Sequence, residues 1–152
     1  MLYIDTSALL KFYKPERGTD YISRLIREAE EGKIKLLSSI WIMLESIAAI
    51  QSWLARGWIN RRERDELLRR LQFDLARWRN LGCLHLEELH SILVIEAGAL
   101  IIKHSLEPGD AIHLSTALRW KGEVEAFITS DRHLRRGVEG EGIEVIDPEE
   151  QT

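Results

Sequence analysis

The chain has 152 residues and a formal net charge of −4, from 21 Lys and Arg residues against 25 Asp and Glu residues. Apolar residues make up 45% and charged residues 30% of the sequence, a balance that predicts one globular domain spanning residues 1–152. A protein that coats nucleic acid by bulk positive charge is excluded, because such domains are usually basic. An enzyme that holds nucleic acid at a single place remains compatible with this charge.

Cys83 is the only cysteine, so no internal disulfide can form and a reducing compartment is expected. The beginning of the chain lacks the basic segment and small-residue cleavage site of a signal peptide. The longest apolar stretch, Ile92 to Ile102, is interrupted by Glu96 and is too short to cross a bilayer. The sequence therefore predicts a cytoplasmic protein with no membrane contact.

The first half of the chain predicts two short buried strands and four helices. In chain order these are a strand at Leu2–Ile4, a helix from Ala8 to Tyr13, a helix from Thr19 to Glu30, a strand from Ile34 to Leu37, a helix from Ile40 to about Arg56 and a charged helix up to about Asn80. The expected boundary residues are Pro15, Gly32, Ser38 or Ser39 as a cap, Gly57 and Asn60.

The second half continues the alternation of strands and helices. It predicts a strand at Leu84–Leu86, helices at Glu88–His104 and Pro108–Trp120, a strand at Ala126–Thr129, a short turn or helix at Asp131–Arg136 and a strand at Ile143–Ile146. Short apolar strands that alternate with helices are typical of an α/β domain with a mostly parallel sheet. We therefore expect a three-layer α/β/α architecture.

Glu45 is the carboxylate whose expected surroundings suit a charge least. The residues three and four positions away on its helix are Trp41, Ile42, Ala48 and Ala49, so its side chain projects from an apolar face. An isolated buried carboxylate is unfavourable and normally becomes neutral or finds a partner. A buried salt bridge or a partly exposed position at the edge of the face is the alternative explanation.

Three aspartates follow expected strands or begin an expected helix. Asp5 follows the first strand, Asp131 follows the strand at 126–129, and Asp110 opens the helix that contains His113. Each of the three can be an ordinary helix cap or turn residue. However, the carboxyl ends of parallel strands are also where open α/β sheets bind ligands. The two interpretations remain open for each aspartate taken alone.

Taken together, the four acids predict a metal site. If they converge, repulsion between like charges makes the cluster unstable without cations. Oxygen ligands without a matching set of His or Cys residues favour Mg²⁺ or Mn²⁺ over Zn²⁺. Such a site can polarise a phosphoryl oxygen, generate hydroxide from bound water and stabilise a leaving oxygen, which are the requirements of phosphodiester hydrolysis.

Four sequence blocks in this order resemble the PIN-domain family, and most closely its VapC-type toxins of prokaryotic toxin–antitoxin pairs. The blocks are MLYIDTSALLKFY at residues 1–13, Leu44-Glu45, GDAIHLSTAL at residues 109–118 and FITSD at residues 127–131. The resemblance covers essentially the whole chain. It implies a PIN-like fold and a Mg²⁺- or Mn²⁺-dependent endoribonuclease.

The resemblance also implies roles for individual residues and partners. The three principal acids that hold the metals correspond to Asp5, Glu45 and Asp110, and a fourth, more variable acid corresponds to Asp131. Supporting hydroxyl groups correspond to Thr129 beside the fourth acid and to Thr6 or Ser7, which could bind a water or phosphate. VapC-type proteins are usually homodimers held inactive by an antitoxin that reaches the active site. The implied partners are therefore RNA, a protein antitoxin and a second copy of the chain.

Three further features have more than one explanation. The arginine-rich segment from Gly57 to Leu81 could contact RNA or an antitoxin, but its interspersed acids favour a solvated helix with local ion pairs. His113 and His133 could bind metal or transfer protons, although packing or a supporting role is favoured. Four of the five tryptophans are interpreted mostly as core or interface residues rather than stacking platforms for bases; they are Trp41, Trp53, Trp58 and Trp78.

The leading interpretation is an endoribonuclease toxin in which Asp5, Glu45 and Asp110 activate water through metal, while Asp131 completes a second metal site or orients the water. One alternative is a PIN nuclease of RNA processing that has no antitoxin. Another is a catalytically silent PIN module that binds RNA or protein. A metal-dependent phosphatase is a weaker alternative.

Overall fold

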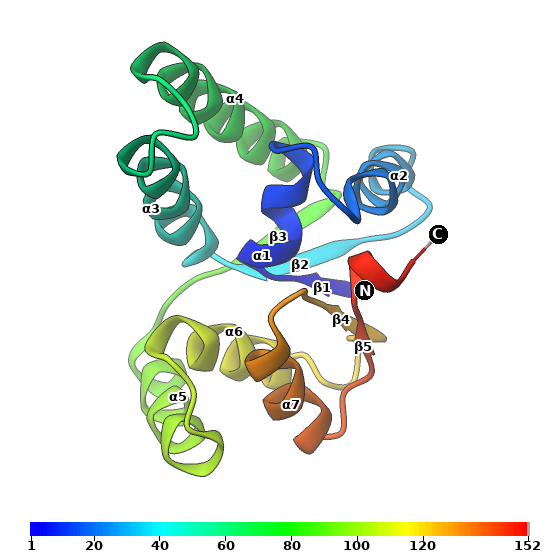
Figure 1. Ribbon diagram of the computed structural model, residues 1–152. Helices are drawn as coiled ribbons and strands as arrows, with labels where there is room; N and C mark the ends of the chain where they lie inside the picture. Colours follow the sequence, from blue (N-terminus) through cyan, green and yellow to red (C-terminus); the bar gives the residue numbers. More distant parts are fainter. Residues whose placement is uncertain (152) are drawn as a thin grey trace.

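A five-stranded sheet lies between two layers of helices in the computed structural model, which describes residues 1–151 (Figure 1). The strands are β1 (Leu2–Ile4), β2 (Leu36–Ser39), β3 (Leu84–Glu87), β4 (Ala126–Ile128) and β5 (Val145–Ile146). Their spatial order is β3-β2-β1-β4-β5, and each neighbouring pair is parallel. The predicted three-layer α/β/α fold is confirmed, and its sheet is parallel throughout.

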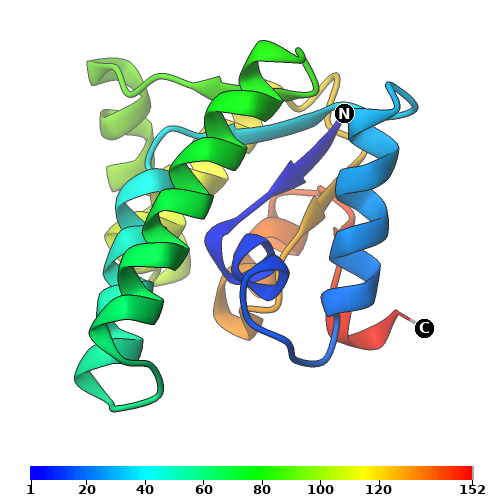
Figure 2. The ribbon, with the colours of Figure 1, turned by 90° about the horizontal axis from the view of Figure 1, so that it is seen from above.

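Helices cover both faces of the sheet. They are α1 (Thr6–Leu9), α2 (Thr19–Glu30), α3 (Ile42–Ala55), α4 (Arg61–Asn80), α5 (Ser91–His104), α6 (Pro108–Arg119) and α7 (Arg132–Gly140), with single 3-10 turns η1 (Leu10–Phe12) and η2 (Pro148–Glu150). Helices α1 to α4 lie on one face and α5 to α7 on the other (Figure 1). Seen from above, α3 and α4 run side by side along the sheet, on the other side of α1 from α2 (Figure 2).

Alternating side chains of the strands fill two separate cores. In β1, Tyr3 packs with the α5–α7 layer, whereas Ile4 packs with the α1–α4 layer. The same alternation separates Phe127 from Ile128 in β4. Because both faces of the sheet are covered, the strands contain few polar residues, as the apolar runs of the sequence predict.

The start of α3 differs from the prediction. Strand β2 ends at Ser39 rather than Leu37, so both serines belong to the strand and are fully buried. The Ser38 hydroxyl donates to the Ile4 carbonyl at 2.7 Å, and the Ser39 hydroxyl accepts from the Trp41 amide at 3.2 Å. Internal partners for the hydroxyls make serine tolerable in a buried strand. Helix α3 begins at Ile42 without a side-chain cap.

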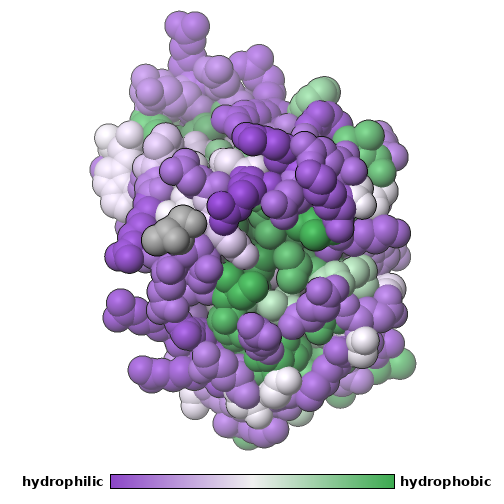
Figure 3. All heavy atoms as spheres, turned by 90° about the vertical axis from the view of Figure 1, so that its right-hand side faces the viewer, coloured by the Kyte–Doolittle hydropathy of each residue, from purple (hydrophilic) through white to green (hydrophobic). Residues whose placement is uncertain are grey.

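Several other boundaries also shift. Helix α1 begins at Thr6 and gives way to the 3-10 turn η1, α5 begins at Ser91 with His90 as its cap, and α7 extends to Gly140. Thr129 lies outside β4, and the last strand is reduced to two residues. Strand β5 forms one edge of the sheet, on the right-hand side of Figure 1. Figure 3 shows this side of the molecule, where a hydrophobic band is visible between hydrophilic surroundings.

Helix α4 supports the interpretation of a solvated, arginine-rich helix. Asn60 and Glu63 form a capping box at its start, and Arg70 and Arg77 pair with acids. The tryptophans divide: Trp78 is buried in the core, whereas Trp58 is 54% exposed with the Lys14 ammonium 4.2 Å from its ring. Within residues 1–151, no helix combines the length and the hydrophobicity that a membrane span needs.

The end of the chain is held against the loop before α2. The buried Lys11 ammonium lies 3.0 Å from the Glu16 carboxylate and 2.6 Å from that of Glu149 in η2. Gly18 adopts a φ of +92°, and a Cβ atom there would lie 2.9 Å from the Pro148 side chain. This close approach fixes η2 beside the start of α2.

Candidate functional site

The four predicted acids line one pocket at the carboxyl ends of neighbouring strands. Asp5 directly follows β1, and Asp131 follows the adjacent strand β4, while Glu45 and Asp110 come from α3 and α6. The pocket has a volume of about 320 Å³, and its wall also includes Thr6, Ser7, Leu10, Ala48 and His113. The structure therefore brings together all four acids, which are separated by up to 126 positions in the sequence.

Asp5 is buried and fully hydrogen-bonded. Its Oδ1 accepts from the Ala8 amide at 2.9 Å, which caps α1, and its Oδ2 accepts from the Thr129 hydroxyl at 2.6 Å. The Ser7 hydroxyl lies 2.9 Å and 3.0 Å from the two oxygens. Burial nevertheless raises the pKa of Asp5, against the opposing effects of His113 and these hydrogen bonds. The capping interpretation is therefore correct, and it does not remove the residue from the pocket.

Glu45 has no polar partner on its own helix, as its apolar neighbours predict. Its Oε2 instead lies 2.7 Å from His113 Nε2 of α6 and accepts a short hydrogen bond from the Thr6 hydroxyl of α1. Burial raises its pKa, but the hydrogen bonds and charge of His113 outweigh burial, so the pKa lies below its ordinary value. Because its side chain is 26% exposed, the alternative of a paired edge position also describes Glu45.

Asp110 is the acid that the fold leaves without a partner. The predicted capping role is wrong, because α6 begins two residues earlier and Glu107 occupies the cap position. No hydrogen bond or ion pair within residues 1–151 involves the Asp110 carboxylate. Burial, followed by the charges of Asp131, Asp5 and Glu45, raises its pKa to about 6. The Asp110 carboxylate therefore faces three like charges without a cationic partner among residues 1–151.

Asp131 caps α7 with one oxygen. Its Oδ1 accepts from the His133 and Leu134 amides at 2.7 Å and 2.8 Å, and its own amide donates to the Thr129 hydroxyl at 3.0 Å. Thr129 thus bonds to both aspartates at the strand ends. The cap fixes the Asp131 side chain at the rim of the pocket. Both the structural and the functional interpretation of this residue are consistent with its position.

A buried chain of hydrogen bonds leads from the sheet to Glu45. The Tyr3 hydroxyl accepts from the Ser39 amide at 3.1 Å and lies 2.7 Å from His113 Nδ1. Burial raises the pKa of Tyr3 well above its ordinary value, so the hydroxyl keeps its proton. The His113 ring thus bridges the Tyr3 hydroxyl through Nδ1 and the Glu45 carboxylate through Nε2.

Tyr3 and Gly109 belong to the site but were not identified from the sequence. Tyr3 looks like an ordinary residue of an apolar strand, and only its hydroxyl group signals a possible bond. A Cβ atom at Gly109 would lie 2.0 Å from Glu45 Oε1 and 3.0 Å from Trp41 Nε1. The absence of a side chain at Gly109 therefore makes room for the Glu45 carboxylate.

The donor chemistry of the pocket fits a hard divalent cation. Its acids supply carboxylate oxygens, which Mg²⁺ and Mn²⁺ prefer, and the raised pKa of Asp110 reflects burial and the charges of the other three acids. As they stand, however, no three His, Cys, Asp or Glu side chains within residues 1–151 are placed to hold one ion together. Ion binding therefore requires movement of the acidic side chains toward one another.

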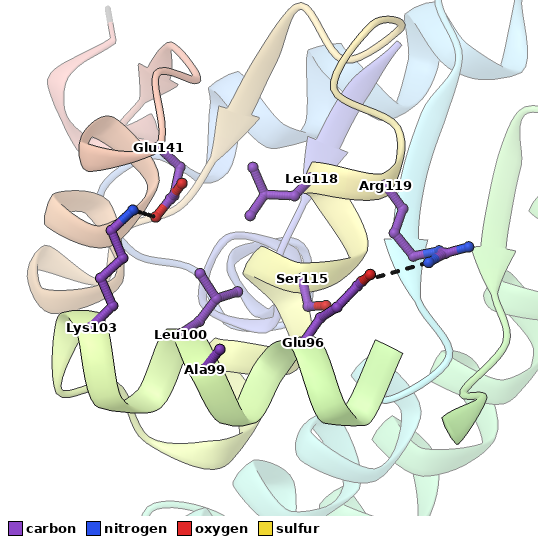
Figure 4. Close-up of a pocket in the computed structure, with 8 residues that line it drawn as sticks. All are labelled: Glu96, Ala99, Leu100, Lys103, Ser115, Leu118, Arg119 and Glu141. Atoms are coloured by element: carbon purple, nitrogen blue, oxygen red, sulfur yellow. Dashed lines mark hydrogen bonds and ion pairs between the residues drawn. The ribbon is translucent and has the colours of Figure 1, made fainter. Parts of the chain in front are cut away.

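Other parts of the fold do not assemble such a site. His133 lies outside the pocket, and its Nε2 is 2.8 Å from the Ser105 carbonyl. A larger pocket of about 540 Å³ lies between α5 and α6, with the ion pairs Lys103–Glu141 and Arg119–Glu96 at its two sides (Figure 4). Its floor is mainly apolar, and its acids are already paired.

Comparison with known proteins connects this geometry to a family. The chain is similar in structure to a toxin–antitoxin complex from Klebsiella pneumoniae, with a TM-score of 0.63 and 16% identity over 97% of this chain and 98% of that chain. It is also similar to FitAcB from Neisseria gonorrhoeae (TM-score 0.67, 14% identity, 99% and 100% coverage) and to PAE2754 from Pyrobaculum aerophilum (TM-score 0.60, 18% identity, 97% and 90% coverage).

At these identities the solved structures show a shared fold. No curated protein matches the chain significantly. The sequence profile of the PIN domain, in contrast, matches residues 2–139, which include all four acids of the pocket. PIN domains are in general nucleases that depend on divalent metals. Since the profile spans nearly the whole sequence, the chain belongs to the PIN-domain family.

Proposed function

We propose that this protein is a Mg²⁺- or Mn²⁺-dependent endoribonuclease that hydrolyses RNA phosphodiester bonds. The observation that carries the proposal is Asp110, whose partnerless carboxylate faces three other acids and has its pKa raised to about 6. The first turn of a helix favours an acid, but here burial and three neighbouring acids disfavour the charge of Asp110. A cation between the acids removes the conflict.

The acids of the pocket have distinct roles in this proposal. Asp5, Glu45 and Asp110 are the principal metal ligands and Asp131 is the fourth, while Thr6, Ser7 and Thr129 orient the carboxylates through hydrogen bonds. The bound cation supplies Lewis acidity toward the phosphoryl oxygen and lowers the pKa of water. The hydroxyl groups of Thr6 and Ser7 lie in the pocket wall, where they can bind a water or a phosphate oxygen.

We also propose that the protein is the toxin of a toxin–antitoxin pair and forms a homodimer. The similarity in fold to the Klebsiella pneumoniae toxin–antitoxin complex supports a protein antitoxin. The exposed apolar surface of α5 supports a contact between two copies, because Ile95 is 73% and Ile102 is 86% exposed on this helix. Light scattering on the purified protein gives the mass that checks the dimer.

Cleavage of RNA by the purified protein tests the proposed function. We expect structured RNAs to be cut with Mg²⁺ or Mn²⁺, to remain intact with EDTA, and to remain intact with the Asp5→Asn variant. Mapping of the cleaved ends identifies the bond. Activity that survives EDTA, or an active Asp5→Asn variant, contradicts the proposal. Hydrolysis of a phosphomonoester without RNA cleavage would instead support the phosphatase alternative.

Replacing Tyr3 with Phe is expected to weaken cation binding by about 10-fold without unfolding the protein. The variant removes the hydroxyl that bonds to His113 Nδ1, so the imidazole that bonds to Glu45 through Nε2 loses the contact that orients it and biases its tautomer. The ring itself remains stacked on Phe127. Titration with Mn²⁺ measures the affinity, and ¹⁵N chemical shifts of His113 report the tautomer. Wild-type affinity together with an unchanged tautomer in Tyr3→Phe contradicts this positioning role.

A further inference from the structure

A second polar pocket begins beside Asp131, the residue at the rim of the acidic pocket. It has a volume of about 540 Å³, and its wall includes Ser130 and Arg132, the two chain neighbours of Asp131. The Ser130 amide donates to the Ser7 hydroxyl at 2.9 Å, and that same hydroxyl bonds to Asp5. The segment from 130 to 132 therefore forms a shared boundary between the two pockets.

Each carboxylate in the wall of this second pocket already has a partner. Arg135 binds two of them, with Glu139 at 2.9 Å and Glu150 at 3.0 Å. The partners of the other two are the Lys11 ammonium, 2.6 Å from Glu149, and the Ser130 hydroxyl, 3.0 Å from Asp147. None of these four carboxylates contacts another arginine of the same wall.

Three arginines of the wall have no such partner. Arg17 comes from the loop before α2, while Arg132 and Arg136 lie one turn apart on α7, and all three are exposed. No hydrogen bond or ion pair within residues 1–151 involves their side chains, in contrast to Arg135. Neighbouring like charges repel each other, and a planar guanidinium matches the oxygens of a phosphate. The wall thus presents three unpaired guanidiniums, which suit a phosphate, beside four carboxylates that have other partners.

We propose that this second pocket binds a backbone phosphate of the RNA next to the one that is cleaved. The inference rests on the proposed function, since it places part of the same substrate. The acidic pocket repels a polyanion, and the chain as a whole has a formal charge of −4. Unpaired guanidiniums directly beside Asp131 offset this repulsion at the place where the strand enters or leaves the acidic pocket. Such contacts fix the register of the strand without reading its bases.

Arginine-to-glutamine variants test the phosphate site. We expect Arg132→Gln and Arg136→Gln, and most strongly the triple variant with Arg17→Gln, to raise KM for RNA cleavage. The rise is about 10-fold for the triple variant, with kcat within twofold of wild type. In an Asp110→Asn background that binds RNA without cutting it, each lost phosphate contact lowers the slope of log K against log salt by about 0.7.

A matched control replaces two exposed arginines elsewhere. Arg61 and Arg62 begin α4 and have no ion pair within residues 1–151, so the double change to Gln removes the same charge as the Arg132→Gln/Arg136→Gln pair, at a different place. We expect its KM and salt slope to be those of wild type. Circular dichroism melting confirms that each variant is folded.

The outcomes separate this inference from the proposed function. If wild type cuts RNA but the triple variant keeps its KM and salt slope, the phosphate site is wrong and the nuclease stands. A loss confined to kcat also overturns the site, because it assigns the arginines to chemistry rather than to binding. If wild type neither binds nor cuts RNA with Mg²⁺ or Mn²⁺, the proposed function itself fails and the site fails with it.

Discussion

Replacing Asp110 with Asn is expected to abolish RNA cleavage and, at the same time, to stabilise the metal-free protein. The loss of activity is about 1,000-fold or more, because a metal ligand contributes several kcal/mol to stabilisation of the transition state. The gain in stability comes from removing a charge that burial and three neighbouring acids disfavour. A residue retained only for the fold would show neither a selective loss of activity nor a gain in stability.

The sign of the pH dependence follows from the raised pKa of Asp110. Its pKa is about 6 in the folded protein, whereas the ordinary value of 3.8 applies to the unfolded chain. Protonation of Asp110 therefore stabilises the folded state. The stabilisation from the protonated form is complete below pH 3.8 and is lost as the pH rises through about 6. At pH 8 the metal-free Asp110→Asn variant should therefore be more stable than wild type by about 1–2 kcal/mol, after allowance for partial solvent screening. Below pH 4 this difference should vanish.

Urea unfolding in EDTA at pH 8 and pH 4 measures this difference. Asp65→Asn is the matched control, since Asp65 is 59% exposed on α4 and makes only a surface ion pair with Arg64. We expect this control to keep full activity and to change the free energy of unfolding by less than about 0.5 kcal/mol. A less stable Asp110→Asn variant at pH 8 would show that the carboxylate is satisfied in a way that its surroundings do not indicate.

The architecture was accessible from the sequence because one signal dominates it. Short apolar runs alternating with amphipathic segments specify a covered parallel sheet, and only the ends of elements shifted. Ser38 and Ser39 lie in β2 although a helix cap is predicted there, because hydroxyl groups at the end of a strand suggest a cap unless the internal acceptor of Ser38, the Ile4 carbonyl, is known. Local sequence contains no information about such a partner 34 positions away.

The candidate site was only partly accessible from the sequence. The apolar neighbours of Glu45 identify it because the helical period alone determines them. Asp5 and Asp131 are both caps and pocket residues, so local patterns cannot separate the two roles. The role of Tyr3 could not be predicted, since its partner His113 lies 110 positions away and nothing in a buried strand distinguishes a bonded hydroxyl from an idle one.

The second large effect is expected for Gly109→Ala, a change of one methyl group. A Cβ atom at this position would lie 2.0 Å from Glu45 Oε1 and 3.1 Å from Glu45 Cδ, so the carboxylate must move. The Glu45 carboxylate is the end of a flexible side chain, so it can move. Alanine also stabilises a helix by up to about 1 kcal/mol relative to glycine. The fold therefore tolerates the change, whereas the metal site loses the position of one principal ligand. We expect RNA cleavage to fall about 100-fold, the typical effect of displacing a reacting group by about 1 Å.

Gly98→Ala provides the control, because Gly98 is also helical and a Cβ atom there meets nothing within 4 Å. We expect this variant to be fully active and slightly more stable. Thermal melting of both variants, Mn²⁺ titration and cleavage rates together separate a displaced ligand from a damaged fold. If Gly109→Ala binds Mn²⁺ and cuts RNA as wild type does, then Glu45 reaches the cation from elsewhere, or it is not a ligand. If Gly109→Ala unfolds while Gly98→Ala does not, the contact with Trp41, 3.0 Å from the new Cβ, dominates over the shift of Glu45.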